Sequence, residues 1–228
     1  MDLSKYPRPS VAVDLVVFGY ETRRLSVLLV KRGIEPFKGK WALPGGFVRE
    51  NESLEETARR ELQEEAGVAE IYLEQLYTFG DVKRDPRGRV LSVSYLALVK
   101  PEDYRLVAST DASDAKWVPL TELPPLAFDH QRIIETGHQR LKNKIRYEPI
   151  GFELLPKLFT LSQLQEIYET VLESELDKRN FRKKILGYGF LKETDKKIEK
   201  VPYRQPTLYR FDTATYRKLK RDGFQFEL

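Results

Sequence analysis

Residues 46–68 read GFVRENESLEETARRELQEEAGV, and this stretch decides how the N-terminal half of the chain folds. The segment predicts a short helix that directly follows a glycine pair. Glu61, Glu64 and Glu65 share one face of that helix, because residues at i, i+3 and i+4 are neighbours. Converging carboxylates repel each other, and a hard cation relieves the repulsion. Oxygen ligands without Cys or His favour Mg²⁺ or Mn²⁺, so we expect a divalent-metal site suited to phosphates.

Both ends of this helix can be located from the sequence. Ser53, with Glu56 three residues later, has the pattern of a capping box, and Gly67 is a usual helix stop. Apolar residues at helical spacing provide a stripe that can anchor the opposite side of the helix on a core. This stripe consists of Leu54, Ala58, Leu62 and Ala66.

The fixed positions of this stretch follow the pattern G-x5-E-x7-R-E-U-x-E-E-x-G-U, where U is aliphatic. They are Gly46, Glu52, Arg60, Glu61, Leu62, Glu64, Glu65, Gly67 and Val68. The stretch resembles the Nudix box, and the preceding residues 41–46, WALPGG, look like its usual lead-in. The resemblance implies hydrolysis of a nucleoside diphosphate linked to another moiety.

The resemblance also implies roles for individual residues. Glu61, Glu64 and Glu65 would ligate Mg²⁺ (or Mn²⁺), the Gly46 carbonyl is a further candidate ligand, and Arg60 would orient a glutamate. Such a metal neutralises charge on phosphate oxygens and lowers the pKa of a bound water. The general base stays open between a box glutamate and an acid from a distant loop.

Composition limits the class of protein. The 228 residues suffice for one large or two small domains, and the absence of Cys excludes disulfides and thiolate metal sites. No apolar run reaches the length of a membrane span, and the N-terminus lacks a signal-peptide core. We expect a soluble, cytoplasmic protein without a membrane partner.

Residues 1–148 are expected to form an α/β (α+β) domain, an α/β/α sandwich with a mixed sheet. Runs rich in strand formers alternate with turns, and a helix with an apolar face closes the domain. The expected strands are Val11–Phe18, Leu25–Lys31, Ile71–Phe79, Val90–Val99 and Trp117–Pro119, and the closing helix is Asp129–Lys144.

The turn between two of these strands is unusually basic. Arg84, Arg87 and Arg89 fall within six residues, and guanidinium groups suit a pyrophosphate. An ordinary charged hairpin turn is the alternative. The segment RDPRGRV followed by SVSY resembles Nudix proteins that handle ADP-ribose, which favours a substrate role for the three arginines.

Four residues elsewhere are further candidates for substrate binding. Arg32, Phe37 and Phe47 lie near the box in sequence and could orient phosphate or stack on adenine. His130, one of two histidines, is the fourth. The alternative for the aromatic residues is packing in the core, and for His130 it is capping or packing.

The positive charge is concentrated near the C-terminus. Residues 178–228 hold 15 Lys and Arg against 6 Asp and Glu, whereas the whole chain has a net charge of +4. Such a segment favours polyanions, although a solvated surface is the alternative.

Residues 149–228 are expected to form a winged helix-turn-helix domain. A helix with Leu161, Leu164 and Ile167 on one face, capped by Thr160 or Ser162, is followed by a turn and a second, basic helix. Asp177 caps this second helix, in which Phe181, Ile185 and Leu186 are expected to face inward. The expected DNA contacts are Lys178, Arg179, Asn180, Arg182, Lys183 and Lys184, with Lys197 and Arg204 in a wing.

The order of these segments resembles the Nudix-related transcriptional regulators of NAD metabolism (NrtR-like). The resemblance implies a homodimer that binds a double-stranded DNA operator and responds to ADP-ribose. Because every box residue is present, we expect hydrolysis of ADP-ribose to AMP and ribose 5-phosphate as well. One alternative is a catalytically silent repressor that senses ADP-ribose or a sugar metabolite. Another is a Nudix nucleotide hydrolase whose C-terminal domain only dimerises.

Overall fold

The structure of the chain is a computed structural model. It describes residues 5–21, 23–66, 71–103, 112–196 and 205–228.

The chain forms two compact units, each of which draws on two segments. The first unit comprises Met1–Gly19 and Leu25–His138, and the second comprises Tyr20–Arg24 and Gln139–Leu228. One helix, α2, therefore begins in the first unit and ends in the second.

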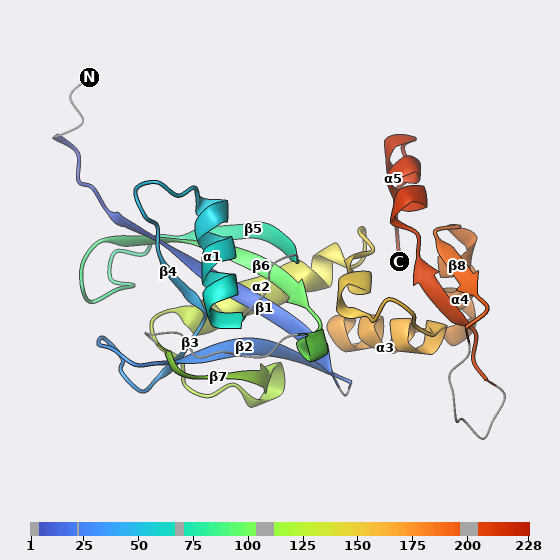
Figure 1. The fold of residues 1–228 in the computed structure, drawn as a ribbon, viewed down its shortest axis with the longest axis horizontal. Coiled ribbons are helices and arrows are strands. Elements are labelled where there is room, and N and C mark those ends of the chain that lie inside the picture. The colour runs from blue at the N-terminus through green and yellow to red at the C-terminus, as the bar shows by residue number, and fades with distance from the viewer. Residues whose placement is uncertain (1–4, 22, 67–70, 104–111, 197–204) are drawn as a thin grey trace. The chain divides into compact units, whose positions relative to one another are not determined.

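The first unit is built on a mixed sheet, to which the described residues contribute seven strands (Figure 1). Its main path runs β3-β2-β1-β6-β5, with β4 beside β1 and β7 beside β2. β1 and β6 are parallel, whereas the pairs of β1 with β4 and of β5 with β6 are antiparallel. The strands are β1 (Ser10–Glu21), β2 (Arg24–Arg32), β3 (Trp41–Ala42), β4 (Gly45–Phe47), β5 (Tyr72–Phe79), β6 (Val90–Val99) and β7 (Ala112–Pro119), and the helices are α1 (Leu54–Ala66) and α2 (His130–Lys144).

Alternate residues of β1 face opposite sides of the sheet, as the two-residue period of a strand requires. Val13 and Leu15 belong to the buried apolar cluster that contains Leu62 of α1. On the other face, Val16 packs so closely on Gly137 of α2 that a Cβ there would lie 2.9 Å from the Val16 side chain. The sheet is thus covered by α1 on one face and α2 on the other, which confirms the predicted α/β/α sandwich.

The start of α1 confirms the predicted capping box. The Ser53 backbone N–H donates to the Glu56 carboxylate at 2.8 Å, and the Glu56 N–H donates back to the Ser53 hydroxyl at 3.2 Å. The predicted stop at Gly67 lies outside the described residues. The sequence prediction missed the short strands β3 and β4, which have too few residues to show an alternating pattern.

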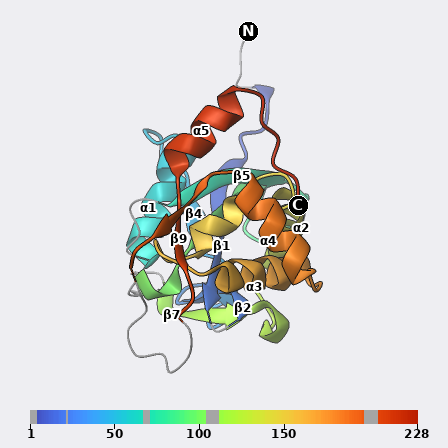
Figure 2. The same cartoon turned by 90° about the vertical axis from the view of Figure 1, so that its right-hand side faces the viewer.

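The second unit contains a helix-turn-helix followed by a two-stranded antiparallel wing, so the predicted winged-helix fold is confirmed (Figure 2). α3 and α4 pack against each other, and α3 also packs on a short 3-10 helix, η4. The elements are η4 (Ile150–Leu154), α3 (Leu161–Leu172), α4 (Lys178–Gly187), β8 (Leu191–Thr194), β9 (Leu208–Phe211) and α5 (Thr213–Arg221).

The caps of both helices in the helix-turn-helix agree with the sequence prediction. Thr160 and Gln163 form a reciprocal capping box at α3. The Asp177 carboxylate accepts a hydrogen bond from the Asn180 backbone N–H at 2.8 Å, and it caps α4. Both caps satisfy N–H groups that have no partner within the helix.

One face of α4 holds the helix on the unit. Phe181 and Ile185 are buried, as predicted, and the Phe181 ring meets the Tyr168 ring of α3 edge to face. The expectation that Leu186 also faces inward is wrong, because its side chain is 43% exposed. Leu186 follows Ile185 by one residue and is therefore turned about 100° away from the buried face.

The sequence prediction did not include α5, the last helix. Tyr216 in α5 packs on Phe190 and Phe211, and after the helix Phe224 and Phe226 return to contact Phe190. A cluster of aromatic side chains therefore holds the chain on both sides of α5.

In the part of the chain that the structure describes, no helix has the length and apolar character needed to cross a membrane.

Candidate functional site

A cavity of about 330 Å³ in the first unit brings together most of the residues that were predicted to bind metal or substrate. Its walls come from β1, β2, β4, α1, the loop after β5 and the start of α2. β4 pairs with β1 so that Gly46 lies opposite Val13, and β4 also contacts α1.

Gly46 and Glu61 form one wall of this cavity and fit tightly together. A Cβ added at Gly46 would lie 2.0 Å from the Glu61 Oε1 atom. The Glu61 side chain is only 10% exposed, and burial raises the pKa of its carboxyl above the ordinary value. A larger side chain at this position would displace the Glu61 carboxylate.

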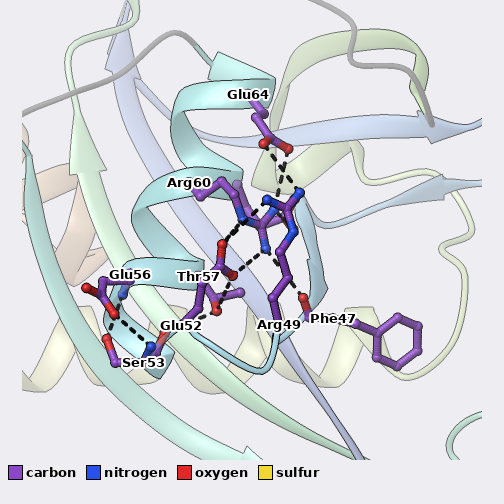
Figure 3. Close-up of polar contacts among 9 residues, drawn as sticks. Phe47, Arg49, Glu52, Ser53, Glu56, Thr57, Arg60 and Glu64 are labelled. Carbon is purple, nitrogen blue, oxygen red and sulfur yellow. Dashed lines mark hydrogen bonds and ion pairs between the residues drawn. The ribbon is translucent and has the colours of Figure 1, made fainter.

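Arg60 ties the box carboxylates together (Figure 3). Its guanidinium donates to both oxygens of Glu52, at 2.7 and 3.0 Å, and to Glu61 at 2.6 Å. These hydrogen bonds lower the pKa of Glu52 to about 2. Thr57 also donates to Glu52, at 3.1 Å. Arg60 therefore holds both Glu52 and Glu61, and its role in orienting a glutamate for the reaction stays a prediction.

Glu64 also lies at this cluster, but it is more exposed. Its carboxylate is 3.4 Å from the Arg60 guanidinium and 3.8 Å from that of Arg49, and its side chain is 47% exposed. The third predicted ligand, Glu65, has a side chain outside the described set. Among the side chains that are described, no group of three carboxylate or imidazole side chains is close enough to hold a metal.

The donor set nevertheless fits a hard divalent cation. Glu61 and Glu64 both reach the same Arg60 nitrogen, so their oxygens converge on one small region beside Gly46. All the candidate donors are oxygen atoms, which suit Mg²⁺ or Mn²⁺ better than softer metals. In this structure the Arg60 guanidinium supplies the positive charge that offsets the repulsion between Glu61 and Glu64, and a bound cation would do the same.

A buried ionic network forms a second wall of the cavity. The Arg84 side chain is only 4% exposed, and it donates to Asp14 at 3.1 Å and to Asp129 at 3.0 and 2.7 Å. Ser92 donates a further hydrogen bond to Asp14. Asp14 stands between apolar residues of β1, and the network explains how its charge is accommodated there.

His130 completes this wall from the start of α2. Its Nδ1 accepts a hydrogen bond from the Leu43 backbone N–H at 2.8 Å, and its Nε2 is 3.5 Å from Asp14. Burial lowers the pKa of His130 below its usual value, although the charge of Asp14 opposes the shift. The imidazole is therefore neutral at pH 7, with its Nε2–H directed toward Asp14.

Aromatic rings and guanidinium groups alternate around the cavity mouth. The Arg32 guanidinium lies 4.9 Å from the centre of the Phe128 ring, and the Arg87 guanidinium lies 5.0 Å from that of Phe47 and 5.7 Å from that of Phe128. Phe37 meets Phe128 edge to face at 4.8 Å. Figure 3 shows the Phe47 ring directed away from the box cluster. Such surfaces suit a ligand with both an aromatic base and phosphates.

Not all the predicted substrate residues are equivalent in the structure. Arg32, Phe47, Arg84, Arg87 and His130 line the cavity, whereas Phe37 reaches it through Phe128.

The three arginines of the loop after β5 differ in their partners. Arg84 is committed to two aspartates, and Arg87 is paired with Asp85 at 2.7 Å. Arg89 donates to the Gly80 carbonyl at 2.6 Å and is not among the lining residues. Sequence reasoning missed Asp14, Phe128 and Asp129. Only Asp14 carried a signal, as an acid inside an apolar run.

The predicted DNA contacts lie on α4 in the second unit. Five of them, Lys178, Arg179, Asn180, Lys183 and Lys184, are exposed. Arg182 is only partly exposed and donates to the Ser162 hydroxyl of α3 at 3.0 Å. The predicted wing residues Lys197 and Arg204 lie outside the described part of the chain.

Comparison with known families matches two segments of the chain. Residues 8–137 match the NUDIX domain, and residues 151–211 match the NrtR DNA-binding winged helix domain.

Individual proteins show the same two parts. The chain is 38% identical over 218 residues to the ADPR responsive transcriptional repressor NtrR of Acinetobacter baylyi, covering 93% of this chain and 86% of the relative. It is 41% identical over 145 residues to the ADP-ribose pyrophosphatase of Methanocaldococcus jannaschii, covering 62% of this chain and 82% of that protein.

The crystal structure of Shewanella oneidensis NrtR complexed with a 27mer DNA has a TM-score of 0.82 and 37% identity to the chain, and the match covers 95% of this chain and 97% of that one. The NUDIX domain of the same protein complexed with ADP ribose has a TM-score of 0.55 and 42% identity, and covers 62% of this chain and 94% of that one. With its Nudix domain followed by an NrtR winged helix domain, the chain belongs to the family of Nudix-related transcriptional regulators represented by NrtR.

Proposed function

We propose that the protein is a transcriptional repressor of NAD metabolism that binds ADP-ribose in its Nudix domain and also hydrolyses it to AMP and ribose 5-phosphate. The observation that carries the catalytic part is the Glu61 carboxylate, which is buried against Gly46 at the wall of the cavity and held by Arg60. The relatives described as an ADPR responsive repressor and as an ADP-ribose pyrophosphatase support the choice of ligand.

Glu61, Glu64, Glu65 and the Gly46 carbonyl would hold Mg²⁺ or Mn²⁺. When bound, such an ion neutralises charge on phosphate oxygens and provides an activated water for attack on phosphorus. Arg60 fixes Glu61 through a hydrogen bond of 2.6 Å and Glu52 through hydrogen bonds of 2.7 and 3.0 Å. The general base remains open between a box glutamate and an acid from another loop.

For ADP-ribose, we assign binding of the adenine ring and the phosphates to the cavity mouth. Arg32 and Arg87 present guanidinium groups beside the rings of Phe47 and Phe128, so stacking and charge are available at one place. Phe37 supports Phe128. Arg84 and His130 act mainly by holding the wall in shape, and Arg89 contributes charge at longer range.

For DNA, we propose that α4 enters the major groove of a double-stranded operator. Its exposed basic residues can contact phosphates and base edges, while Phe181 and Ile185 hold the helix on the unit. Lys197 and Arg204 remain predicted wing contacts. We propose a homodimer, because an operator with two half-sites requires two copies of α4. We also propose a cytoplasmic location, where this function operates. The domain boundary that we propose lies between residues 148 and 149.

A catalytically silent sensor is the second candidate, and the relative described as a repressor favours it. In such a protein Arg60 would satisfy the box glutamates permanently in place of a metal. A hydrolase whose C-terminal domain only dimerises has less support, because the basic residues of α4 are exposed beside a family match to a DNA-binding domain.

The deciding experiment is incubation of the full-length protein with Mg²⁺ and ADP-ribose while AMP is measured. We expect release of AMP by the unaltered protein and a loss of about 100-fold or more for Glu64→Gln. Glu55→Gln is a matched control, since Glu55 is on the same helix but forms its ion pair with exposed Arg59. Binding of ADP-ribose, measured by calorimetry, without any release of AMP would identify the silent sensor. Absence of both binding and release would contradict both candidates.

A further inference from the structure

Helix α5 is a strongly basic element that lies beyond the matched winged-helix domain. The family match ends at residue 211, whereas α5 spans Thr213–Arg221. Its nine residues include four cations and no acid, and none of its side chains is buried. Apart from Tyr216, which packs on Phe190 and Phe211, this helix contributes little to the core of the unit.

Three of the four cations have no hydrogen-bond or ion-pair partner among the described residues. They are Arg217, Lys218 and Arg221, and all three are exposed. The fourth, Lys220, lies 3.6 Å from Glu148. Arg217 and Arg221 are four residues apart, and Lys218 and Arg221 are three apart, so the unpaired cations share one side of the helix. These three cations repel one another, and a bound polyanion would relieve that repulsion.

The helix is held firmly at both ends, although no side chain within it is buried. At its start, Asp212 accepts hydrogen bonds from the Thr215 N–H and hydroxyl, and the Asp212 N–H donates to the Phe190 carbonyl at 2.8 Å. At its end, Phe224 packs on Tyr188. A basic helix on two fixed anchors presents its charges in a defined place, which a flexible basic tail does not.

We propose that α5 binds the sugar-phosphate backbone of the same DNA duplex that α4 enters, through Arg217, Lys218 and Arg221. The proposal rests on the DNA-binding function proposed above. Both helices belong to the second unit, and Phe224, which follows α5, packs on Tyr188 at the end of α4. A duplex carries about one charge per 1.7 Å of its axis, so phosphates are dense enough to meet a second element beside the reading helix.

Contacts of this kind add affinity without reading sequence. They also have a measurable signature, because each phosphate that is neutralised releases counterions. The logarithm of affinity then falls with the logarithm of salt by about 0.9 for each such phosphate. The change in salt slope caused by a substitution therefore shows how many phosphates the removed side chains neutralise.

The test measures fluorescence anisotropy of the full-length protein with a fluorescein-labelled duplex of arbitrary sequence at several potassium chloride concentrations. The test variant is Arg217→Ala with Lys218→Ala and Arg221→Ala. The control variant removes three exposed cations of the first unit, through Lys5→Ala, Lys38→Ala and Lys83→Ala. A charge-conserving variant, Arg217→Lys with Arg221→Lys, separates charge from shape. Thermal unfolding of each variant shows whether it folds.

We expect the test variant to lose about 10-fold or more in affinity at low salt, with a salt slope that is shallower by about 2 to 3. The control and the charge-conserving variant should keep the slope of the unaltered protein. Equal slopes for the test variant and the unaltered protein would overturn the proposal while leaving DNA binding by α4 intact. The same equality would result if α5 served an acidic protein surface. Failure of the unaltered protein to bind any duplex would overturn the DNA-binding function and this proposal together.

Discussion

Charged side chains in the cavity of the first unit are held by fixed partners, whereas those on α4 and α5 are mostly exposed to solvent. Arg60, Arg84 and Arg87 each bond to carboxylates within 3.1 Å, and the Arg84 side chain is almost fully buried. On α4, Lys178, Arg179, Lys183 and Lys184 are exposed.

This difference teaches that one chain uses charge for two purposes. Buried and paired charges are oriented before a ligand arrives, and salt screens them weakly. Exposed charges are free to follow a duplex, and salt weakens their binding strongly. Substitutions in the cavity should therefore change stability and turnover, and substitutions on the helices should change salt-dependent affinity.

The largest effect is expected for Arg84→Ala, which tests whether the cavity charges depend on their partners. Removal of the guanidinium leaves Asp14 and Asp129 without their cation, and Asp14 is buried. Breaking a buried pair in this way costs about 3 to 5 kcal/mol of the free energy of unfolding. Urea denaturation measures the loss. Arg89→Ala on the same loop is the control and should cost less than about 1 kcal/mol, and similar losses for the two variants would contradict the assigned network.

The second effect concerns the contact between Gly46 and Glu61. Gly46→Ala inserts a methyl group where the Glu61 carboxylate lies, so that the carboxylate must move. We expect the rate of AMP release to fall by about 100-fold, because Glu61, the proposed metal ligand, loses its position. Gly187→Ala, at the end of α4, meets no atom within 4 Å and should leave turnover unchanged. Full activity of Gly46→Ala would show that the position of Glu61 does not matter for turnover.

The third effect concerns the exposed basic residues of α4. Arg179→Ala with Lys183→Ala removes two cations of α4 that have no partner among the described residues, and should weaken DNA binding by about 10-fold at low salt. Turnover of ADP-ribose should not change. Arg182→Ala differs from this pair, because Arg182 bonds to Ser162 and its loss should also lower stability. A double variant that keeps the affinity and salt slope of the unaltered protein would contradict the assignment of α4 as the helix that enters the major groove.

The smallest effect is a dependence of stability on pH that arises from His130. Burial lowers the pKa of this imidazole in the folded protein, so below about pH 6.5 the unfolded state takes up a proton that the folded state does not. The free energy of unfolding should therefore decrease as the pH falls through this value, by at most about 1.4 kcal/mol per pH unit. His130→Asn, which keeps an acceptor for the Leu43 N–H, should flatten this part of the curve. An unchanged curve would assign the pH dependence to other groups.

Local patterns were enough to predict much of the architecture. The capping residues Ser53, Thr160 and Asp177 and the apolar faces of α1 and α4 follow from spacing along a helix, and the structure contains them. The exposure of the basic residues of α4 could also be predicted, since the residues of a short amphipathic helix that lie outside its apolar face are exposed to solvent.

Contacts between distant segments could not be predicted in this way. Arg84 meets Asp14 and Asp129 across 70 and 45 residues, and no local spacing records such a pairing. The three arginines after β5 therefore appeared equivalent in sequence, although the fold buries one, pairs the second with Asp85 and directs the third to a backbone carbonyl. Helix α5 was missed because it is short and its apolar side has only Tyr216 and Leu219, which are too few to show a helical period.

Helix α2 has a practical consequence for anyone who wishes to divide this protein. It starts at His130 in the first unit and continues to Lys144 in the second, so a fragment that stops at residue 138 ends in the middle of a helix. A fragment that starts at residue 149 lacks the segment Tyr20–Arg24, whose Arg23 forms an ion pair with Glu166 at 2.6 Å. No single cleavage point yields two intact halves. Limited proteolysis should accordingly trim loops before it releases either unit whole.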